Sequence, residues 1–387
     1  MNIEQVVTAA QVREFVQMPV PLYKNDPHYI RPLDADVEAV FDPEKNALLA
    51  NGACARWILR GEKGSAIGRI AAFVNPKTCN EYEQPTGGTG FFECIDDQQA
   101  ADLLFNTAKN WLAEKGMEAM DGPVNFGDRD RWWGLLTDGF LPPNYCCNYN
   151  PPYYQALFER YGFEVFFRQY TYWKALEPRQ PELYEKVTAR LLRSGDYTIR
   201  KIEKRRLEKY AEDFRTIYNK AWASHEGVDP MTAAHTRKLL LKMKPVIDER
   251  IAFFAYHKDE PIGFFLCLPE LNELFVKDVR GNMNWFGILR LLWNQATDSC
   301  KTMYGLAFGV IPEYQRKGVE AALVVSADHF MREDKVPYAS IQMNWIGDFN
   351  PRMMHVAEQI NAVIYKTHHT YRYLFDRTKP FKRMQEL

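Results

Sequence analysis

The sequence has almost no net charge, no paired cysteine motif and no long apolar run. Its 49 Lys and Arg residues stand against 50 Asp and Glu residues, a formal net charge of −1. Proteins whose main partner is nucleic acid usually carry a basic patch and a high positive charge, so we expect no nucleic-acid partner. The seven cysteines include no C-x-x-C pair and fit neither a disulfide framework nor a zinc site, so we expect no metal.

No stretch reaches the ~18 to 20 apolar residues that a membrane-spanning helix needs. The N-terminal run MNIEQVVTAAQVREF lacks the basic region followed by an apolar region that is typical of a secretory signal. We therefore expect a cytoplasmic protein without a transmembrane segment. Peripheral contact with a membrane stays open, and so does the oligomeric state.

The chain is long enough for two domains. Hydrophobic residues make up 46% of the 387 residues, and this length exceeds what one core usually supports. Pro178 and Pro181 follow the strand-like run VFFRQYTYW, and proline there disfavours continuation of a strand or helix. We therefore predict an N-terminal domain over residues 1–177 and a C-terminal domain over residues 178–387.

Strand and helix patterns alternate in the second half, which indicates an α/β fold. The predicted order is a helical insertion to about Ser299, then strand 302–310, helix 318–333, strand 338–346, helix 351–360 and strand 362–375. The first half has the same order in weaker form. Asn150-Pro151 and Asn350-Pro351 each precede a helical pattern, and Asn is a good N-cap while Pro suits the first turn. We interpret the halves as a divergent internal repeat.

The run Gly309 to Leu323, GVIPEYQRKGVEAAL, joins a predicted strand to a predicted helix. The N-terminus of a helix has unpaired backbone N–H groups and about half a positive charge, which together can bind a pyrophosphate. Gly318 removes a side chain where the backbone would approach phosphates, and Arg316 and Lys317 add positive charge. On these residues alone, a plain connection with a solvated basic turn is the alternative.

This run resembles the motif Q/R-x-x-G-x-G/A, after a V-x-P-x-Y segment, of the GNAT acyltransferase superfamily. Positions 310, 312, 314 and 315–319 match. The resemblance implies that acetyl-CoA or acyl-CoA, as co-substrate, places its pyrophosphate on the backbone amides of about 315–321. It also implies that the strand ending at Val310 splays from strand 338–346 to admit the pantetheine arm. The cofactor-binding residues expected on this basis are Val310, Gln315, Arg316, Lys317, Gly318, Val319, Ala321 and Asn350.

Glu320 departs from that motif, because the superfamily has Gly or Ala at this position. A carboxylate in the first turn of a helix is favourable by about 0.3–1 kcal/mol through the helix dipole, and it would fill electrostatically the place that a phosphate needs. Either Glu320 stabilises the empty site and weakens CoA binding, or it points outward and leaves Ala321 close to the ligand.

The first half has no equivalent of this turn. Asp96 and Asp97 stand between its strand 87–96 and the following helix, and two carboxylates would repel a pyrophosphate. We therefore predict that the N-terminal domain is a degenerate GNAT-like domain without a cofactor site.

A loop rich in rings and polar groups covers residues 121–154. Loops of this length inside compact domains are usually functional or disordered, and so many aromatic residues argue against disorder. The loop either caps the core and docks the two domains or binds a substrate, and the two roles are compatible. The candidate substrate-binding residues are Arg129, Trp132, Trp133, Tyr149, Asn150 and Tyr153.

The whole layout resembles a bacterial family of tandem GNAT-like domains that is mostly uncharacterised. The segments that carry this resemblance include LYKNDPHYIRPL (22–33), GFFECIDD (90–97) and YNPPYY (149–154), and they extend it over nearly the full chain. The resemblance implies two tandem GNAT-like domains, each a mixed sheet flanked by helices. Some relatives of this kind are connected to long-chain N-acylation of lipid precursors, so the expected partner is a small-molecule or lipid-precursor amine.

In GNAT enzymes an amine attacks the thioester while a base removes its proton. Strand 302–310 contains no carboxylate, so the usual glutamate is missing there. His355 lies on the helix where the superfamily often places its Tyr, and it is the first catalytic candidate; Glu320 is another, with His329 and Glu358 nearby.

We predict an acyl-CoA-dependent N-acyltransferase that moves an acetyl or longer acyl group to an amine. The alternative is a non-catalytic GNAT-like protein that binds CoA or another ligand, which Glu320 and the missing strand carboxylate favour. A transferase resembling the peptidoglycan aminoacyltransferases, which use aminoacyl-tRNA, is disfavoured by the near-zero net charge.

Overall fold

The computed structural model describes residues 1–127, 129, 131–177, 180–222 and 230–385. Pro178, at the predicted domain boundary, lies outside these residues, as do residues 128 and 130 of the aromatic loop. The first half contains β1 (Asn2–Gln5), α1 (Ala9–Gln17), α2 (Pro19–Leu22), α3 (Asp34–Phe41), η1 (Ala47–Ala50), β2 (Ala53–Arg60), β3 (Ala66–Val74), β4 (Thr86–Cys94), α4 (Gln98–Glu114), β5 (Ala119–Gly122), β6 (Leu135–Asp138), α5 (Tyr154–Tyr161) and β7 (Glu164–Ala175).

The second half opens with an extra helix, α6, which precedes its first strand. Its elements are α6 (Glu182–Leu192), β8 (Tyr197–Lys201), η2 (Lys204–Arg206), α7 (Leu207–Trp222), α8 (Ala233–Met243), η3 (Glu249–Ile251), β9 (Ala252–His257), β10 (Glu260–Pro269), η4 (Asn272–Val276), α9 (Lys277–Val279), α10 (Trp285–Ala296), β11 (Thr302–Val310), η5 (Pro312–Tyr314), α11 (Val319–Glu333), β12 (Ser340–Met343), β13 (Ile346–Gly347), α12 (Pro351–Gln359) and β14 (Val363–Leu374). The predicted helical insertion before strand 302–310 is confirmed by η4, α9 and α10.

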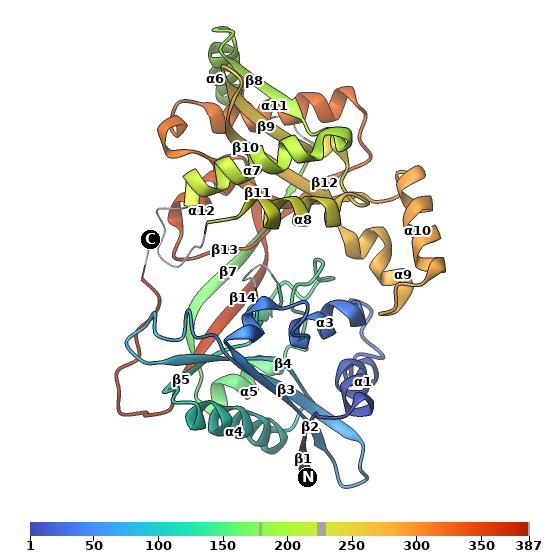
Figure 1. The fold of residues 1–387 in the computed structure, drawn as a ribbon, viewed down its shortest axis with the longest axis vertical. Helices are drawn as coiled ribbons and strands as arrows, with labels where there is room; N and C mark the ends of the chain where they lie inside the picture. The colour runs from blue at the N-terminus through green and yellow to red at the C-terminus, as the bar shows by residue number, and fades with distance from the viewer. Residues whose placement is uncertain (128, 130, 178–179, 223–229, 386–387) are drawn as a thin grey trace.

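One continuous sheet runs through both halves, in the order β1-β2-β3-β4-β5-β14-β7-β12-β11-β10-β9-β8. Along this path β4 pairs with β5 and β11 with β12 in parallel, and the other neighbours are antiparallel. Helices flank the sheet in both halves (Figure 1). The predicted α/β class, with mixed sheets flanked by helices, is confirmed.

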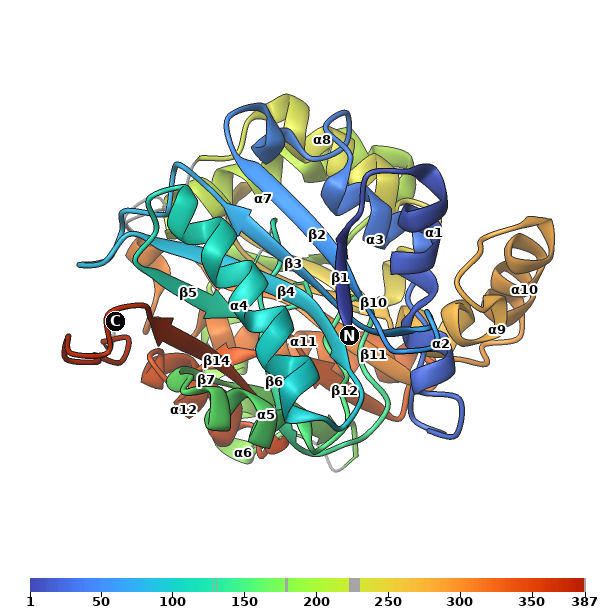
Figure 2. The same cartoon turned by 90° about the horizontal axis from the view of Figure 1, so that it is seen from below.

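The sheet of the first half is buried on both faces because its strands alternate between two apolar layers. Trp57 and Leu59 of β2 lie in the layer beneath α4 and α5, whereas Ile58 lies in the layer beneath α1 and α3. Figure 2 shows α4 crossing one face of this sheet, with α1 and α3 on the other side. This alternation follows from the two-residue repeat of a strand.

The two halves exchange their last strands. β14, from the end of the chain, pairs with β5 of the first half, with Tyr371 opposite Gly122. β7, from the end of the first half, pairs with β12 of the second half, with Lys174 opposite Ile341. β7 and β14 also pair with each other and run side by side between the halves (Figure 1). The boundary between residues 177 and 178 follows β7 in sequence and stays a prediction, since each half takes its last strand from the other.

The prediction that Asn150-Pro151 opens a helix is wrong, although Asn350 does cap α12 by accepting a hydrogen bond from Met353 N at 3.2 Å. α5 begins only at Tyr154. The Asn150 side chain is buried and instead bonds the backbone of Leu136, accepting from its N–H at 2.8 Å and donating to its carbonyl at 3.0 Å. Asn150 thus ties the last part of the aromatic loop to β6, a strand that forms inside the same loop, and the spacing of Asn150 and Pro151 could not reveal this contact.

Candidate active site

The predicted phosphate-binding turn forms a strand–turn–helix unit from β11 to α11. Gly318 is the N-cap of α11 with φ of 92°, a left-handed conformation that favours glycine, and no side chain of the described residues caps this helix. Gln315 Nε2 donates to Val310 O at 3.0 Å, so its side chain braces the turn against the end of β11. The turn therefore offers backbone N–H groups to a ligand at the start of α11.

The other residues predicted to contact the cofactor divide into buried and exposed side chains. Val310, Val319 and Ala321 are buried, so their backbone groups are what a ligand at this turn could meet. Arg316 and Lys317 are exposed, and Lys317 Nζ lies 5.1 Å from the ring centre of Tyr314. The two cations flank the turn where a pyrophosphate would need charge.

Glu320 folds back onto the same turn. Its Oε1 accepts a hydrogen bond from the backbone N–H of Arg316 at 3.3 Å. Of the two alternatives expected from the sequence, this geometry favours the one in which the carboxylate takes the place of a phosphate oxygen. The charge of Glu320, second to burial, also raises the pKa of Tyr184 on α6.

Helix α6 packs across the start of α11 and reaches α12. A Cβ on Gly318 would lie 2.6 Å from Val187 of α6, so only glycine fits there. Tyr184 donates to Gln359 of α12 at 3.0 Å, and His355 Nε2 lies 2.8 Å from Gln359 Nε2. The structure thus links the two catalytic candidates, Glu320 and His355, through α6, and His355 is exposed. His329 contacts Glu185 at 3.1 Å on the same helix.

β11 and β12 separate beside this turn. Their parallel pairing runs only from Thr302 and Ser340 to Gly305 and Met343, so the later part of β11 has no partner on that side among the described strands. Ile311 N–H bonds β10, and successive N–H groups alternate along a strand. The N–H groups of Val310 and Phe308 therefore point into the gap, where a carbonyl oxygen could accept a hydrogen bond.

The corresponding unit of the first half, β4–α4–β5, also has a gap between its two parallel strands. Unlike the start of α11, however, the start of its helix is capped by a side chain. β4 and β5 pair only as far as Gly88 and Asp121, so the later part of β4 also separates from its neighbour. Asp97 caps α4, and its Oδ1 accepts from Gln99 N at 2.8 Å and from Ala100 N at 3.3 Å. A carboxylate thus occupies the helix end that a phosphate would use. That the N-terminal domain is degenerate and lacks a cofactor site stays a prediction.

A cavity lies in this gap of the first half, bordered by the aromatic loop. Its wall is largely aromatic and aliphatic, and it is lined by Tyr29, Ile30, Pro32, Val37, Arg69, Phe91, Phe92, Glu93, Pro123, Trp132, Leu135, Pro143, Cys147, Asn148, Tyr149, Asn150 and Tyr154. Of the candidate substrate-binding residues, Trp132, Tyr149 and Asn150 line it. Tyr153 donates instead to Cys94 O at 2.7 Å.

Arg129 and Trp133 lie away from this cavity. Arg129 forms an ion pair with Glu81 at 3.7 Å, lies 5.8 Å from the ring centre of Trp133, and accepts at its carbonyl from Trp345 Nε1 at 2.9 Å. Through Trp345 it joins the aromatic loop to the segment after β12. This part of the loop docks the halves together.

Glu93 and Arg69 are buried charges in the cavity wall that the sequence reasoning missed. Glu93 Oε2 accepts from Tyr23 at 2.7 Å and from Tyr154 at 2.8 Å, and Arg69 approaches Oε1 at 3.4 Å. Burial raises the pKa of Glu93. Arg69 Nε is buried without a hydrogen-bond partner among the described residues, which is costly unless a ligand or water accepts from it. The only sequence signal was a single charge inside the apolar run GFFEC.

Lys366 of β14 was also missed, and it lies at the junction of the two halves. It is 2% exposed, and its Nζ donates to Pro142 O at 2.6 Å, Asn144 Oδ1 at 3.1 Å and Gln342 Oε1 at 3.2 Å. Burial lowers the pKa of Lys366 to about 8. A lysine on an alternating strand carries no sequence signal of burial.

The residues around Lys366 lie between the gap that separates β11 from β12 and the aromatic cavity of the first half. Gln342 lies on β12 one residue before its pairing with β11 ends. Pro143 and Cys147, on either side of Asn144 and Tyr145, line the cavity of the first half. Lys366 therefore stands between the gap beside the α11 turn and the aromatic cavity.

The depressed pKa of Lys366 predicts a pH-dependent stability. Between pH 8 and the unfolded value of about 10.5 the Lys366 side chain binds fewer protons in the folded state than in the unfolded state, so the contribution of Lys366 to the free energy of unfolding should rise with pH in that window. Buried cysteines whose pKa is raised, such as Cys267 and Cys300, act in the opposite direction, so this contribution is read from a comparison with a variant that lacks the lysine. The full rise is about 3 kcal/mol, at about 1.36 kcal/mol for each pKa unit. Chemical denaturation at pH 7 to 10.5 measures it as the free energy of unfolding of wild type minus that of Lys366→Met. This difference should rise with pH, whereas the difference between wild type and Lys24→Met, an exposed control, should stay constant. If the free energy of unfolding changes equally with pH in wild type and in Lys366→Met, the pKa of Lys366 is not lowered by burial.

No cluster of His, Cys, Asp or Glu suited to a metal occurs among the described residues. Within the same residues no helix is both long and apolar enough to cross a membrane.

The chain is similar to known proteins over nearly its whole length. A protein named bacterial ceramide synthase, from Caulobacter vibrioides (strain NA1000 / CB15N), is 28% identical over 381 residues, 96% of this chain and 97% of the relative. Protein YghO of Escherichia coli (strain K12) is 26% identical over 371 residues, 93% of this chain and 92% of the relative. No protein-family model matches the chain.

Among solved structures, a tandem GNAT protein from the clavulanic acid biosynthesis pathway superposes with a TM-score of 0.55 at 11% identity, covering 98% of this chain and 100% of that one. At this identity the likeness concerns the fold. It extends over both halves, and it agrees with the repeated strand–helix–strand unit seen at β4–α4–β5 and β11–α11–β12. The chain therefore has the fold of a tandem GNAT protein, with one such unit in each half.

Proposed function

We propose that the protein is an acyl-CoA-dependent N-acyltransferase whose second half binds the CoA thioester. The observation that carries this proposal is the bare N-terminus of α11 beside the gap between β11 and β12. A pyrophosphate fits the first element and an extended pantetheine arm fits the second.

The residues at this site suit CoA except for Glu320. The N–H groups at the start of α11, with Arg316 and Lys317, would hold the diphosphate, and the N–H groups of Phe308 and Val310 would orient the thioester carbonyl. Glu320 competes with the diphosphate for Arg316 N–H. CoA binding therefore requires this carboxylate to turn outward, at a cost of about 0.3–1 kcal/mol.

We further propose that the acceptor is a long-chain amino alcohol. The relative named bacterial ceramide synthase supports this class, because a ceramide is an N-acylated long-chain amino alcohol. The aromatic cavity supports the polar end of such an acceptor: Glu93 suits an ammonium group and the unpartnered Arg69 Nε suits a hydroxyl oxygen, whereas a long chain would have to extend out of this small cavity. Long-chain acyl-CoA is the matching donor.

Lys366 is the side chain that we propose for proton transfer, in place of His355. In the reaction the amine nitrogen bonds to the thioester carbonyl carbon, the carbon–sulfur bond breaks, and CoA leaves as the free thiol. The amine must lose a proton, and an amine base with a pKa of about 8 is partly unprotonated near neutral pH. Lys366 contacts Asn144 and Gln342, next to the walls of the cavity and of the gap, and substrate binding would have to open its buried hydrogen bonds to expose the amine.

The reaction is tested by incubating the protein with palmitoyl-CoA, with and without sphinganine, and measuring free CoA and N-acyl product by chromatography. Chromatography is used because cysteine thiols of the protein, such as the partly exposed Cys54, would add to the signal of a colorimetric thiol reagent. We expect free CoA and amide in equal amounts, only when both substrates are present. If CoA raises the midpoint of thermal unfolding but no amide forms, the non-catalytic alternative holds. If millimolar CoA leaves the midpoint unchanged, the protein is neither an acyl-CoA-dependent enzyme nor a CoA-binding protein.

Glu320→Ala should tighten CoA binding. Removal of the competing carboxylate should lower Kd about two- to fivefold, which corresponds to about 0.3–1 kcal/mol. Isothermal titration with CoA measures this, with Glu313→Ala as a matched control, because Glu313 is an exposed carboxylate on the same turn. A Kd that is unchanged in Glu320→Ala, or lowered equally in both variants, would rule out specific competition.

A further inference from the structure

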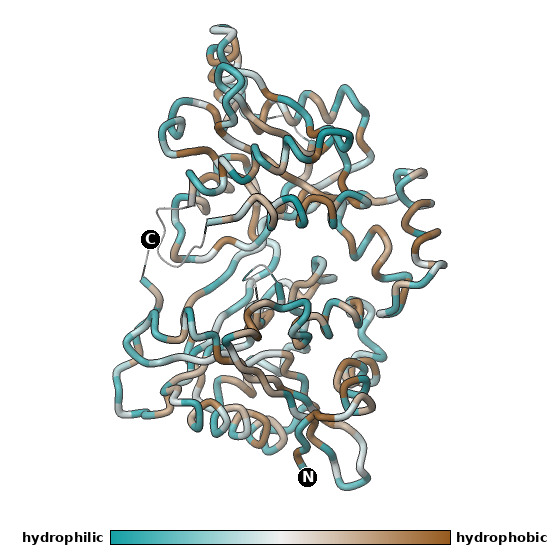
Figure 3. The backbone as a smooth tube through the Cα atoms, in the orientation of Figure 1, coloured by the Kyte–Doolittle hydropathy of each residue, from teal (hydrophilic) through white to brown (hydrophobic). Residues whose placement is uncertain are grey.

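Helix α10 turns its apolar side chains outward. Six large apolar residues of this helix are 51–73% exposed: Trp285, Phe286, Ile288, Leu289, Leu292 and Trp293. We call them the α10 apolar face. Figure 3 shows hydrophobic colour along α10, at the edge of the molecule. A contiguous exposed patch of this kind marks an interaction site more often than an ordinary surface.

The inner side of α10 is narrow and firmly attached. Its buried residues are Gly287, Leu291 and Asn294, which recur at helical spacing. A Cβ on Gly287 would lie 2.6 Å from Val279 of α9, and Asn294 donates to Leu274 O at 2.6 Å. α10 therefore packs closely through this stripe, and its apolar face stays exposed while the helix is folded.

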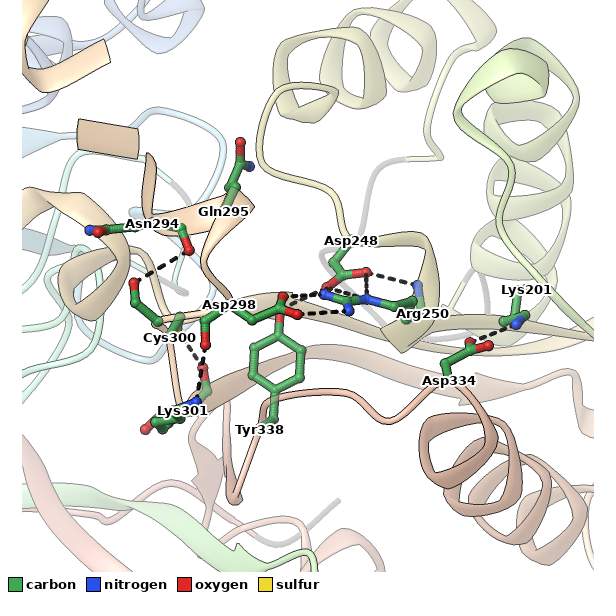
Figure 4. A network of polar contacts seen from close by, with 12 residues as sticks. Lys201, Asp248, Arg250, Asn294, Gln295, Asp298, Cys300, Lys301, Asp334 and Tyr338 are labelled. Atoms are coloured by element: carbon green, nitrogen blue, oxygen red, sulfur yellow. Dashed lines mark hydrogen bonds and ion pairs between the residues drawn. The ribbon is translucent and has the colours of Figure 1, made fainter. Parts of the chain in front are cut away.

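Polar contacts fix the end of α10 to the body of the second half. Gln295 donates to Pro245 O at 2.8 Å, and Asp298, just after the helix, forms an ion pair with Arg250 at 2.8 Å. Figure 4 shows Asp298 and Asp248 converging on Arg250. At the other end, Gly281 O accepts from Asp34 N of the first half at 2.8 Å. Figures 1 and 2 both show α9 and α10 projecting from the side of the molecule.

The charges around the α10 apolar face are mainly positive. Residues 277–293 contain Lys277, Arg280 and Arg290, all exposed, and one acid, Asp278, which pairs with Arg290 at 2.9 Å. The exposed Lys242 and Lys244 precede Pro245, which contacts the end of α10. An apolar surface bordered by cations suits an anionic lipid headgroup region.

We propose that α9 and α10 dock the protein on the surface of an anionic lipid bilayer. α10 has 12 residues and is about 18 Å long, shorter than the ~30 Å hydrocarbon core, so it lies in the interface and does not span it. Trp285 begins the helix and Trp293 lies in its last turn, and tryptophan favours the interface. A second copy of the chain fits less well, because a two-fold contact would bring the same cations face to face.

Docking through α10 would bring the aromatic cavity near the lipid. Segment 29–34 carries Tyr29, Ile30 and Pro32 in the cavity wall and Asp34 at the α9–α10 turn. A lipid acceptor could therefore reach the cavity from the bilayer. The docking itself does not depend on acyl transfer, and it is tested without either substrate.

The test is co-sedimentation of the full chain with vesicles of pure phosphatidylcholine or of equimolar phosphatidylcholine and phosphatidylglycerol. Wild type should bind the anionic vesicles and lose affinity as salt is raised. Leu289→Glu/Leu292→Glu should weaken binding roughly tenfold or more, since two apolar side chains leave the lipid. Leu183→Glu/Leu103→Glu, an equal charge change at two exposed leucines elsewhere, should weaken it far less.

Thermal midpoints of all variants check that each one folds. Lys277→Gln/Arg280→Gln keeps the apolar face and should lower affinity for anionic vesicles only. The proposal is overturned if wild type binds neither vesicle, or if both leucine pairs weaken binding equally. It is also overturned if ultracentrifugation finds a dimer that Leu289→Glu/Leu292→Glu dissociates while vesicles are not bound; amide formation in detergent would survive any of these outcomes.

Discussion

A fragment that ends at residue 177 is expected not to fold, although it contains every element of the first half. In the full chain β5 and β7 both pair with β14, and β7 pairs on its other side with β12. The fragment lacks both partners, so β5 becomes an edge and β7 has no neighbour. It also loses Tyr371, which is fully buried in the apolar layer with α4 and α5. Circular dichroism and denaturant titration should find no cooperative transition in the fragment.

The matched control is co-expression of residues 1–177 with residues 178–387. If the exchanged strands are what each fragment lacks, the two should co-purify as a folded complex with a cooperative transition like that of the intact chain. A fragment 1–177 that unfolds cooperatively alone would contradict this reading. It would indicate that β7 can replace β14 beside β5, as in a domain that does not exchange strands.

Arg372→Ala is expected to destabilise the protein by about 3–5 kcal/mol, because it removes one partner of a buried ion pair and leaves the other charge unpaired. Arg372 is 4% exposed, and it reaches from β14 to Asp121 of β5 through two contacts, at 2.6 Å and 2.8 Å. Its guanidinium also lies 3.6 Å from the ring centre of Phe166. Urea denaturation at pH 7 measures the change in free energy of unfolding.

Arg377→Ala serves as the comparison. Arg377 pairs with Glu164 at 3.5 Å, and both side chains are nearly half exposed, so its loss should cost at most about 1 kcal/mol. The double variant Arg372→Met/Asp121→Leu should recover much of the stability lost in Arg372→Ala, because no buried charge is then left alone. If the two alanine variants lose equal stability, the Arg372–Asp121 pair does not hold the exchanged strand in place.

The sequence predicted the unit from β11 to α11 well because its signals are local. Strand 302–310 matches β11 residue for residue, and α11 begins at Val319, one residue after the predicted start. Both depend on side-chain periodicity and on Gly318. The gap between β11 and β12, which the GNAT resemblance implied, is present as well.

The strand exchange could not be predicted, because the local pattern of a strand does not say which neighbour it will have. The sequences of β7 and β14 have similar strand patterns, and either strand could complete the sheet of either half. The burial of Glu93 and of Lys366 was not predicted for a related reason: each is a single charged residue whose burial depends on groups distant in sequence. For Glu93 these are Tyr23 and Tyr154, and for Lys366 they are Pro142, Asn144 and Gln342.

The exchange of β7 and β14 has a mechanical consequence. In many two-domain proteins a linker acts as a hinge, and the lobes close on a ligand as separate bodies. Here two long paired strands run from one half into the other, so a hinge motion would have to bend or break a hydrogen-bonded ladder in the middle of the sheet. The two halves therefore form one frame, and we expect substrates to bind without closure of one half on the other.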